Sequence, residues 1–460
     1  MRPLTLAEVA EAVGGTISGD ATVEVRGASA DSRAVAASDL FVAIPGERVD
    51  GHDYIDQAAA AGAAAALSTR PSTLPTVVVT DPVTALGSLA RWLVAGLPDL
   101  TVVAVTGSSG KTSTKDLLAA VMARRGPVVA PAGSMNTEVG LPLTALRCDR
   151  DTRSLVAEMG ARGTGHIAYL CELTPPDISI VLNVGTAHLG EFGSREAIAA
   201  AKGEIVEALR PEGVAILNAD DPLVAAMAER TSATVLTYGA SAGADLRIQD
   251  LTLDALARPS FTLTTATEAA AVTMKVSGEH SAWNGAAAVL AGVAAGVPLA
   301  EAAAALSAAE AVSRWRMEIT TTADGVTIVN DAYNANPSSM AAALKSLAEI
   351  GRAGSGRTWA VLGEMKELGP DSATEHDLIG RLAVRLNIGR LVAVGDGARP
   401  LHLGAAHEGS WDGESVWVAD KDAAVALLRA QVVPGDVVLV KGSRSVGLES
   451  VAEALLDGSA

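Results

Sequence analysis

The sequence predicts an α/β protein of three consecutive domains, in which strands alternate with helices. At 460 residues the chain is too long to fold around one hydrophobic core. Short apolar runs separated by helical segments recur through its second and third parts, which is typical of mostly parallel sheets with crossover helices. One of these strands leads into a glycine-rich turn followed by Lys111 and Thr112. We expect domains at residues 1–98, 99–312 and 313–460.

Composition limits the partners of the chain. A net charge of −18 argues against nucleic acid, because binding the phosphate backbone requires a basic face. The alanine-rich stretch 285–312 is interrupted by Pro298 and Glu301, so it predicts soluble helices and no membrane insertion. The N-terminus lacks the basic and apolar regions of a secretory signal, and two isolated thiols, Cys148 and Cys171, suit a reducing cytosol. We therefore expect a cytoplasmic protein.

The first domain is expected to be a small α/β unit. Its predicted elements are a helix at 6–13, strands near 23–28 and 40–44, a helix at 54–61 and a strand at 76–79. Acidic residues outnumber basic ones here, so backbone N–H groups and a few polar side chains would have to hold an anionic ligand. Ser32, Arg33 and residues 50–52 are candidates, although each could equally belong to an ordinary exposed loop.

A phosphate-binding loop is predicted at the start of the second domain. Residues 102–105 read as a buried strand, and the segment after the turn has the apolar spacing of a helix. N–H groups and the dipole at a helix start favour an anion, a lysine here reaches the terminal phosphates, and the following threonine can hold Mg²⁺. Val105 stands where the general pattern has its first glycine, so only the tighter core of the motif is present. The predicted nucleotide-binding residues are Gly107, Ser108, Ser109, Gly110, Lys111, Thr112 and Ser113.

The rest of the second domain is predicted to build a mostly parallel sheet around this loop. Further strands are expected at 154–159, 178–184, 214–218 and 234–238, with crossover helices at 163–173, 194–209 and 221–229. Residues 244–276 are expected to form antiparallel strands at one edge. Because ligands bind at the carboxyl ends of parallel strands, polar residues there are candidates for the site.

Three polar residues could serve a complex of Mg²⁺ with a nucleoside triphosphate. Glu158 ends a strand, and its carboxylate supplies the oxygen ligands that Mg²⁺ prefers. His188 could ligate a second cation, or it could be an ordinary loop histidine. Lys202 lies within a helix, where a solvated surface lysine is the simpler interpretation. The chain has 8 lysines against 27 arginines, so a lysine can mark chemistry that arginine cannot perform, although Lys345 lies in no evident motif.

Asparagine side chains follow other predicted strands. Asn218 ends one strand, and Asn284 precedes the alanine-rich helix together with His280. An asparagine can hydrogen-bond both edges of a base, but either residue could equally cap a helix.

The third domain is expected to be a Rossmann-like α/β domain. Its strands are predicted at 327–330, 359–362, 391–394, 416–418 and 437–440. No Gly-x-Gly-x-x-Gly run follows its first strand, so a dinucleotide cofactor is not expected. Asp331, Asn334 and Asn336 crowd the loop after that strand, and Asn336 with Pro337 is typical of a helix start. Three such side chains exceed what a cap requires. Residues 441–444 offer two cations to an anion, or form a polar loop.

Together these motifs resemble those of the Mur ligases, the ATP-dependent amide-forming enzymes of peptidoglycan precursor synthesis, over nearly the whole chain. The resemblance implies that residues 106–113 hold ATP and that Glu158 and His188 bind two magnesium ions. It also implies that Lys202 is the lysine that is often carbamylated in this family, where the modified side chain supports the second magnesium. Lys111, Lys202 and His188 are then the catalytic residues.

The resemblance also implies the remaining ATP contacts. Asn284 matches an asparagine near the adenine, although Ser281 stands where relatives commonly have another asparagine. Arg316 and Asp331 match residues that face ATP in the family.

Within the family, the third domain is similar to the form that adds D-alanyl-D-alanine. Residues 330–340, 361–369 and 441–449 carry this similarity. The form that adds the third peptide residue usually has an Asp-Asn-Pro-Arg signature, whereas this chain has Asn-Ala-Asn-Pro. Tyr333, Asn334 and Asn336 are therefore implied to place the incoming dipeptide.

The first domain resembles the UDP-sugar-binding domain of the family, at residues that include Ser32 and Arg33. Asn136 and Thr137 lie in a run that resembles a loop near the sugar-peptide. The expected reaction joins D-alanyl-D-alanine to UDP-N-acetylmuramoyl-tripeptide through an acyl phosphate. We expect a monomer whose third domain closes over the second before the chemical steps.

Other functions remain open. Another Mur-type or a folylpolyglutamate-type ligase would share the fold, although the first domain argues against the folate enzyme. A nucleotide-switched binding protein would use the phosphate loop without ligation, and a simple kinase would release a phosphorylated product.

Overall fold

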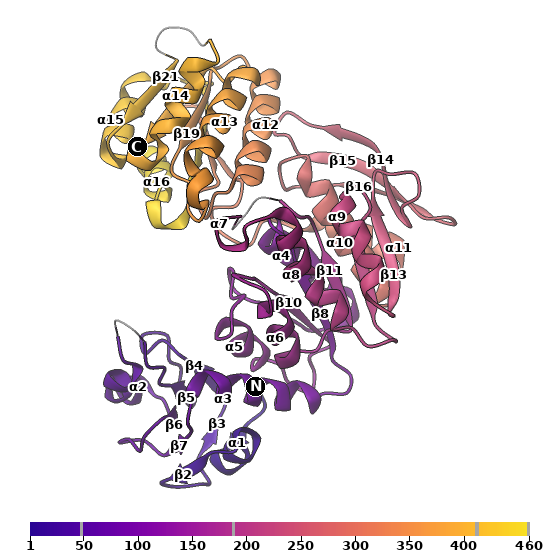
Figure 1. The fold of residues 1–460 in the computed structure, drawn as a ribbon, viewed down its shortest axis with the longest axis vertical. Coiled ribbons are helices and arrows are strands. Elements are labelled where there is room, and N and C mark those ends of the chain that lie inside the picture. The colour runs from indigo at the N-terminus through magenta and orange to yellow at the C-terminus, as the bar shows by residue number, and fades with distance from the viewer. Residues whose placement is uncertain (47–48, 186–188, 410–413, 458–460) are drawn as a thin grey trace.

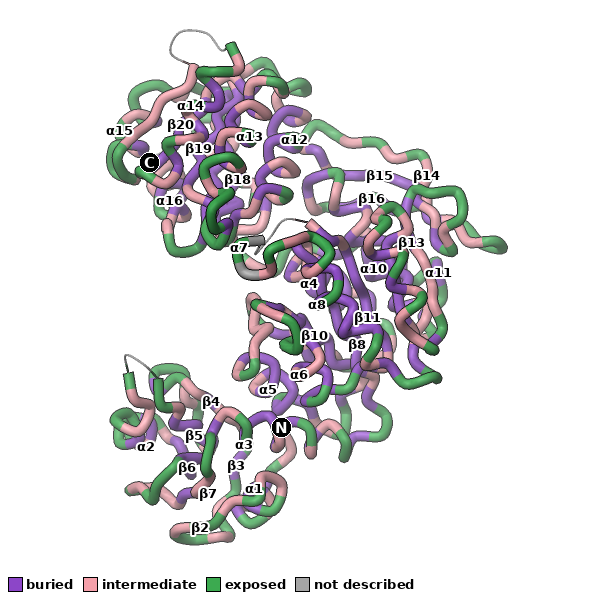
Figure 2. Tube along the Cα trace, in the orientation of Figure 1, coloured by how far each residue is buried: buried purple, intermediate pink, exposed green. Residues whose placement is uncertain are grey.

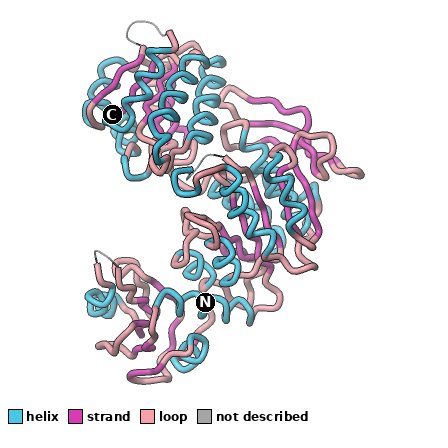
Figure 3. Tube along the Cα trace, in the orientation of Figure 1, coloured by secondary structure: helices cyan, strands magenta, loops and turns pink. Residues whose placement is uncertain are grey.

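The chain folds into three α/β bodies that follow one another along the sequence (Figure 1). The structure is a computed structural model that describes residues 1–46, 49–185, 189–409 and 414–457. Figure 3 shows that each body combines strands with surrounding helices, so the predicted three-domain α/β fold is confirmed.

The N-terminal body is a five-stranded sheet of order β2-β7-β6-β5-β4, parallel except for β2, beside a ribbon of β1 and β3. Its strands are β1 (Leu4–Thr5), β2 (Thr16–Ser18), β3 (Glu24–Val25), β4 (Gly27–Ser29), β5 (Asp39–Val42), β6 (Ala65–Ser68) and β7 (Thr76–Val78), and its helices are α1 (Leu6–Val13), α2 (Ile55–Ala61) and α3 (Pro82–Ala95). Four of these elements, β1, β2, β6 and α3, were not predicted, and the single strand expected near 23–28 is divided into β3 and β4. The β6 run Ala-Ala-Leu-Ser lacks the β-branched residues that usually mark a strand.

The central body is a nine-stranded sheet of order β16-β15-β14-β13-β12-β11-β8-β10-β9. Its strands are β8 (Thr101–Thr106), β9 (Val128–Val129), β10 (Ser154–Glu158), β11 (Ile178–Val181), β12 (Val214–Asn218), β13 (Thr234–Gly239), β14 (Leu246–Leu253), β15 (Pro259–Thr264) and β16 (Ala269–Thr273). Its helices are α4 (Lys111–Met122), α5 (Gly140–Ala145), α6 (His166–Leu173), α7 (Leu189–Phe192), α8 (Arg195–Glu207), α9 (Pro222–Ala225), α10 (His280–Ala294) and α11 (Leu299–Ala308).

One predicted helix of the central body was wrong in detail. The helix expected at 221–229 is only α9, followed by a 3₁₀ turn over Ala226–Arg230. The strands β14, β15 and β16 are antiparallel to one another at one edge of the sheet, as predicted, and β14 also pairs parallel with β13. The sheet is therefore parallel from β14 to β9, and the carboxyl ends of its central strands meet at one edge.

The C-terminal body is a six-stranded sheet of order β17-β18-β22-β19-β20-β21, in which β17 alone is antiparallel. Its strands are β17 (Glu318–Thr321), β18 (Thr327–Asn330), β19 (Thr358–Leu362), β20 (Arg390–Val394), β21 (Ser415–Val418) and β22 (Val437–Lys441), and its helices are α12 (Pro337–Ala353), α13 (Ser372–Arg385), α14 (Arg399–His407), α15 (Lys421–Gln431) and α16 (Glu449–Asp457). The five predicted strands lie within one residue of the observed ones. The edge strand β17 was not predicted.

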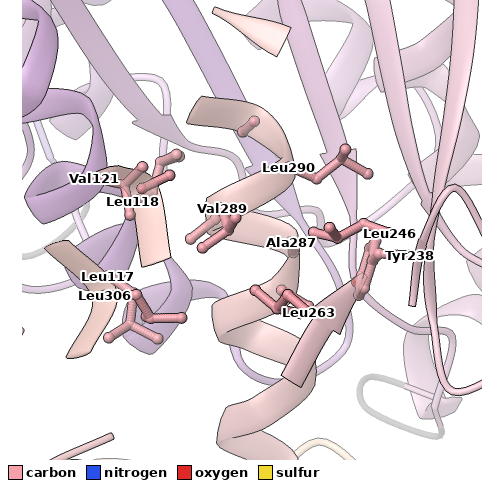
Figure 4. Close-up of a cluster of buried hydrophobic side chains, with 14 of the residues drawn as sticks. Leu117, Leu118, Val121, Tyr238, Leu246, Leu263, Ala287, Val289, Leu290 and Leu306 are labelled. Atoms are coloured by element: carbon pink, nitrogen blue, oxygen red, sulfur yellow. The ribbon is translucent and has the colours of Figure 1, made fainter. Parts of the chain in front are cut away.

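The alanine-rich stretch forms α10 and α11, and its small residues allow close packing. In Figure 4, Ala287 and Val289 of α10 lie between Val121 of α4 and Leu263 of the sheet. A Cβ atom on Gly292 would lie 2.4 Å from Val121 Cγ1, so a larger residue would push α10 away from α4. Figure 2 shows buried residues along the strands of each body. Among the described residues, no helix has both the length and the apolar character needed to cross a membrane.

Candidate active site

A cavity of about 1050 Å³ lies at the carboxyl ends of the central strands, and the C-terminal body supplies part of its wall. The predicted site residues that line it are Ser108, Ser109, Gly110, Lys111, Thr112, Ser113, Asn136, Thr137, Glu158, Lys202, Asn284, Arg316, Asp331, Tyr333, Asn334 and Asn336. Gly107 belongs to the same loop without lining the cavity. Ser32 and Arg33 lie in the N-terminal body, and His188 lies outside the described residues.

The phosphate loop has the geometry of an anion cradle. Gly110 precedes α4 with φ of +81°, and a Cβ atom there would lie 2.8 Å from Asn284 Oδ1, so glycine is required on both grounds. Lys111 Nζ donates to the Gly107 carbonyl at 2.7 Å, which folds the ammonium back over the loop. Burial lowers the pKa of Lys111, while the Glu158 carboxylate raises it and the Arg316 guanidinium lowers it. The loop therefore presents a partly buried cation and the start of a helix to the same space.

Glu158 is a buried carboxylate with one oxygen unused. Its side chain is 1% exposed, and Oε1 accepts a hydrogen bond from Asn136 Nδ2 at 2.8 Å. Oε2 is buried without a hydrogen-bond partner among the described residues. A buried carboxylate oxygen is costly unless a cation or donor meets it. Glu158 therefore fits a divalent cation, with the Thr112 hydroxyl as a second protein ligand.

Apart from Glu158, the ligands of that cation would be largely hydroxyl and phosphate oxygens. Within the described parts of the chain, no group of three or more His, Cys, Asp or Glu side chains is placed to hold a metal. A cation held by one or two protein oxygens and by substrate phosphates is the arrangement that Mg²⁺ usually adopts.

Lys202 lies inside the protein, so its interpretation as a solvated surface lysine is wrong. It lies in α8 beside the cavity, is 5% exposed, and has no hydrogen-bond partner among the described residues. Burial lowers the pKa of Lys202 well below its usual range, and the nearby Lys111 ammonium lowers it further. Lys202 is therefore disposed to carry a neutral amine into the cavity.

Arg316 and Tyr333 bring the C-terminal body onto the phosphate loop. Arg316 Nη2 donates to Thr112 Oγ1 at 3.1 Å, and its guanidinium carbon lies 4.1 Å from the centre of the Tyr333 ring. The Tyr333 hydroxyl is hydrogen-bonded to Ser134 Oγ of the central body. Trp315 and Met317, on either side of Arg316, have positive φ angles of 59° and 51°. Backbone strain of this kind persists where the surroundings hold a side chain in one place.

Asp331 and Lys441 form a buried ion pair at the cavity wall. Lys441 Nζ donates to Asp331 Oδ2 at 2.6 Å and to the Asn334 carbonyl at 2.8 Å. Burial lowers the pKa of Lys441, and the Asp331 carboxylate opposes that shift. The remaining Asp331 oxygen accepts the Met317 N–H at 3.1 Å, so the pair also holds the segment that carries Arg316.

We expect the Lys441→Met variant to lower the free energy of unfolding by about 3–5 kcal/mol, because it leaves the Asp331 carboxylate buried without its cation. Chemical denaturation monitored by tryptophan fluorescence measures this loss. Lys275→Met is the matched control, because Lys275 is half-exposed and pairs with exposed Glu310. Equal denaturation midpoints for the two variants would contradict the prediction.

The asparagines after β18 have both structural and site contacts. Asn336 caps α12, since its Oδ1 accepts the Ser339 N–H at 2.9 Å, as the sequence predicted. Its Nδ2 also donates to the Ser108 carbonyl at 3.4 Å, which joins the cap to the phosphate loop. Asn334 Oδ1 accepts the Ala335 N–H at 2.9 Å. The loop is therefore preorganised at the cavity wall.

The candidate groups of the N-terminal body have protein partners. Ser32 Oγ donates to Gln57 Oε1 at 3.1 Å, and exposed Arg33 pairs with Asp31 at 2.8 Å. In the run 50–52, Asp50 accepts the His52 N–H at 3.0 Å. Their role in binding a ligand stays a prediction.

Several cavity residues were not predicted. Arg162, His166 and Lys345 line the cavity, and Ser134 contacts Tyr333. Arg162 and His166 follow Glu158 closely in the sequence, and a search beyond the last residue of each strand would have found them. Asn284 Nδ2 and His280 Nδ1 are buried without hydrogen-bond partners among the described residues, so both have polar atoms available in the cavity.

The fold and the cavity define a phosphate-loop enzyme whose site lies between its central and C-terminal domains. Three family models match consecutive parts of the chain: "Mur ligase family, catalytic domain" at 24–110, "Mur ligase middle domain" at 105–292, and "Mur ligase, glutamate ligase domain" at 315–444. The chain therefore belongs to the Mur ligase family, and the resemblance of its motifs to that family is confirmed.

Several relatives that are similar over nearly the full length of this chain have the same name. The UDP-N-acetylmuramoyl-tripeptide–D-alanyl-D-alanine ligase of Mycobacterium tuberculosis is 48% identical over 99% of this chain and 98% of its own. The same ligase of Bacillus subtilis is 35% identical over 98% of each chain. MurF from Acinetobacter baumannii has a similar structure, with a TM-score of 0.89, 31% identity and 99% coverage of both chains. MurF ligase from Thermotoga maritima, solved in complex with ADP, has a TM-score of 0.81 and 31% identity over 95% of this chain and 98% of its own.

Proposed function

We propose that the chain is an ATP-dependent ligase that joins D-alanyl-D-alanine to UDP-N-acetylmuramoyl-tripeptide, with release of ADP and phosphate. The observation that carries the proposal is that three features converge on one cavity: the phosphate loop, the buried Lys202 amine, and a Glu158 oxygen that has no partner among the described residues. The name of the relative from Mycobacterium tuberculosis and the ADP in the Thermotoga maritima structure support it. The product is the pentapeptide precursor of peptidoglycan.

We assign one substrate to each domain. Residues 1–98 bind UDP-N-acetylmuramoyl-peptide, with Ser32 and Arg33 as contacts. Residues 99–312 bind ATP, and residues 313–460 bind the incoming dipeptide. The protein acts as a cytoplasmic monomer, without nucleic acid and without membrane insertion.

The first chemical step activates the donor carboxylate, because hydroxide is too poor a leaving group for direct amide formation. A carboxylate oxygen of the tripeptide attacks the γ-phosphorus of ATP, the bond from that phosphorus to the β,γ-bridging oxygen breaks, and ADP departs with the electron pair. The protein contributes position and charge, because phosphoryl transfer needs little else from it. The N–H groups of the loop and Lys111 meet the phosphates, while Asn136 and Thr137 face the donor.

Magnesium fits the residues present. Thr112 and Glu158 would hold one ion, since Glu158 keeps a buried oxygen without a partner among the described residues. His188 and a modified Lys202 would support a second ion. When bound, these ions neutralise the phosphate and carboxylate oxygens that must approach one another.

We propose that Lys202 is carbamylated. Its neutral amine nitrogen bonds to the carbon of CO₂ and releases one proton, which leaves a carboxylate-like anion on the side chain. Burial and the charge of Lys111 lower the pKa of Lys202, so the neutral amine is available at lower pH than on a surface lysine. Arginine stays protonated and could not take part in this reaction.

The second step forms the amide. The amine of D-alanyl-D-alanine attacks the acyl carbon, phosphate leaves with the electron pair of its bond to carbon, and the nitrogen loses its proton. Tyr333, Asn334 and Asn336 line the cavity from the C-terminal domain, and we assign the dipeptide to them. Arg316 and Asp331 face ATP, and Asn284 offers to the adenine an amide nitrogen that has no partner in the described parts of the chain.

We expect ATP and the UDP-sugar peptide together to make the molecule more compact, because an acyl phosphate must be kept from water. Small-angle scattering of the protein with and without both ligands measures the radius of gyration. A smaller radius is expected with both ligands, and identical radii would contradict domain closure.

The function is tested by phosphate release with UDP-N-acetylmuramoyl-tripeptide and a panel of acceptor dipeptides. A ligase of the proposed type requires both substrates and prefers D-alanyl-D-alanine. Release without either substrate indicates a nucleotide switch, and a phosphorylated product without an amide indicates a kinase. Preference for another acceptor or for a folate indicates a different amide ligase.

A further inference from the structure

Lys115 is a buried lysine of the phosphate helix α4, one turn after Lys111. Its side chain is 2% exposed, which is unusual for a group that is charged at neutral pH. An ammonium so deeply buried is retained only when each of its hydrogens meets an acceptor. The hydrogen-bond partners of Lys115 therefore indicate which segments its ammonium group holds in place.

The three acceptors of the ammonium come from three different segments. Lys115 Nζ pairs with Asp116 Oδ1 at 2.6 Å and donates to the Pro131 carbonyl at 2.9 Å and to Ser313 Oγ at 3.3 Å. This number matches the three donors of an ammonium group. The second Asp116 oxygen accepts the Ser313 N–H at 3.0 Å. Ser313 is therefore attached to α4 by its side chain and by its backbone.

Pro131 begins the segment on one side of the cavity. Ser134, three residues later, is hydrogen-bonded to Tyr333, and Asn136 donates to Glu158 at 2.8 Å. The position of this segment therefore decides how the Glu158 carboxylate is turned.

Ser313 stands at the entry to the C-terminal domain. Arg316, three residues later, donates to Thr112 Oγ1 at 3.1 Å. Thr112 and Lys115 are three residues apart in α4, so both lie on one face of that helix. Residues 313–316 form the linker to the C-terminal domain. Ser313 is bound to Lys115, and Arg316 is bound to Thr112, so both ends of this linker are held on the same face of α4.

We propose that Lys115 is a positioning residue for the ligation reaction. Its ammonium fastens the Pro131 segment and the Ser313 linker to the phosphate helix, so that Glu158 and Arg316 converge on Thr112. It acts through these residues and touches no substrate. The proposal rests on the proposed function, because the convergence matters only where ATP is used at Thr112.

The test compares Lys115→Met with the surface control Lys275→Met. We expect Lys115→Met to raise the KM for ATP and the Kd of a non-hydrolysable ATP analogue about tenfold, as the loss of a supporting contact commonly does. The Kd of UDP-N-acetylmuramic acid, which lacks the peptide that Asn136 and Thr137 face, should stay within about twofold of the original when it is measured by calorimetry without ATP, because its sugar site lies in another domain. Lys275→Met should change neither affinity.

A merely structural role would give a different pattern. Loss of folded protein lowers kcat at unchanged KM, so an unchanged KM for ATP and an unchanged Kd of the analogue would overturn the proposal. Ser313→Ala keeps the Lys115–Asp116 pair and removes only the linker hydroxyl. It should raise the KM for ATP about threefold and add nothing in the Lys115→Met background, because both changes break one tie.

Ser313→Ala decides the matter alone if Lys115→Met fails to fold, and an unchanged KM for ATP would then overturn the proposal. If the unsubstituted protein ligates nothing, the proposed function fails. In that case the Kd of the ATP analogue still shows whether Lys115 and Ser313 position the ATP site. Failure of the proposed function and failure of the positioning role are therefore distinguishable.

Discussion

Lys111→Met should lower kcat for ligation about a thousandfold, because the loop loses the cation that meets the transferring phosphoryl group. Methionine is unbranched and only one atom shorter than lysine, so the change removes the charge and the bond to the Gly107 carbonyl with little change in packing. Phosphate release under saturating substrates measures kcat.

The control for this variant is Lys275→Met, which should keep full activity. Binding of UDP-N-acetylmuramoyl-tripeptide by Lys111→Met should be unchanged, which confirms that the protein is folded. Retention of more than about a tenth of kcat would mean that the phosphates are neutralised elsewhere, and the account of the loop would then be wrong.

Lys202→Ala and Lys202→Arg should both lower kcat about a hundredfold or more, because neither side chain can become a carbamate. The two variants separate the possible roles of the residue. If Lys202 acted as a cation, Lys202→Arg would keep part of the activity. If Lys202 acts as a carbamate, Lys202→Arg would be as inactive as Lys202→Ala.

Chemical rescue of Lys202→Ala tests directly whether the missing group is an anion or a cation. A short carboxylate such as acetate should restore part of the activity by occupying the space of the missing anion. Methylamine, which matches the unmodified ammonium, should not restore it. Full activity of Lys202→Ala without any additive, or rescue by methylamine alone, would refute the carbamate.

Local patterns predicted the parts of the site that lie along one segment. The spacing from β8 through Gly110 to Lys111 placed the phosphate loop, because strand, turn and helix signals are adjacent in the sequence. Asn336 and Pro337 likewise marked the start of α12. The helix α3 had a similar signal that was not used, since Asp81 caps it and Pro82 begins it.

Contacts between distant segments could not be predicted in this way. Lys202 is buried because α8 packs against α6 and the central sheet, and the sequence of the helix does not show which side is covered. The Tyr333 contact with Ser134 joins residues from two domains, so it depends on how those domains are arranged.

The small number of lysines in the sequence was a weak pattern by itself, but it indicated the position of the site better than we expected. Lys111, Lys202, Lys345 and Lys441 line the cavity, and Lys115 lies beneath it. Lys345 was not linked to any motif by the sequence, because its place on α12 faces the cavity only in the folded chain. A chain that uses arginine for most of its positive charge has kept lysine mainly near this site.

The central claim is that ATP, held by the loop that ends at Lys111, phosphorylates the carboxylate of the tripeptide. Tripeptide labelled with a heavy oxygen isotope in that carboxylate tests it directly, by mass analysis of the phosphate released during ligation. We predict that each phosphate carries one labelled oxygen taken from the carboxylate. Phosphate that forms together with the amide but carries no label would contradict the acyl phosphate and the function built on it.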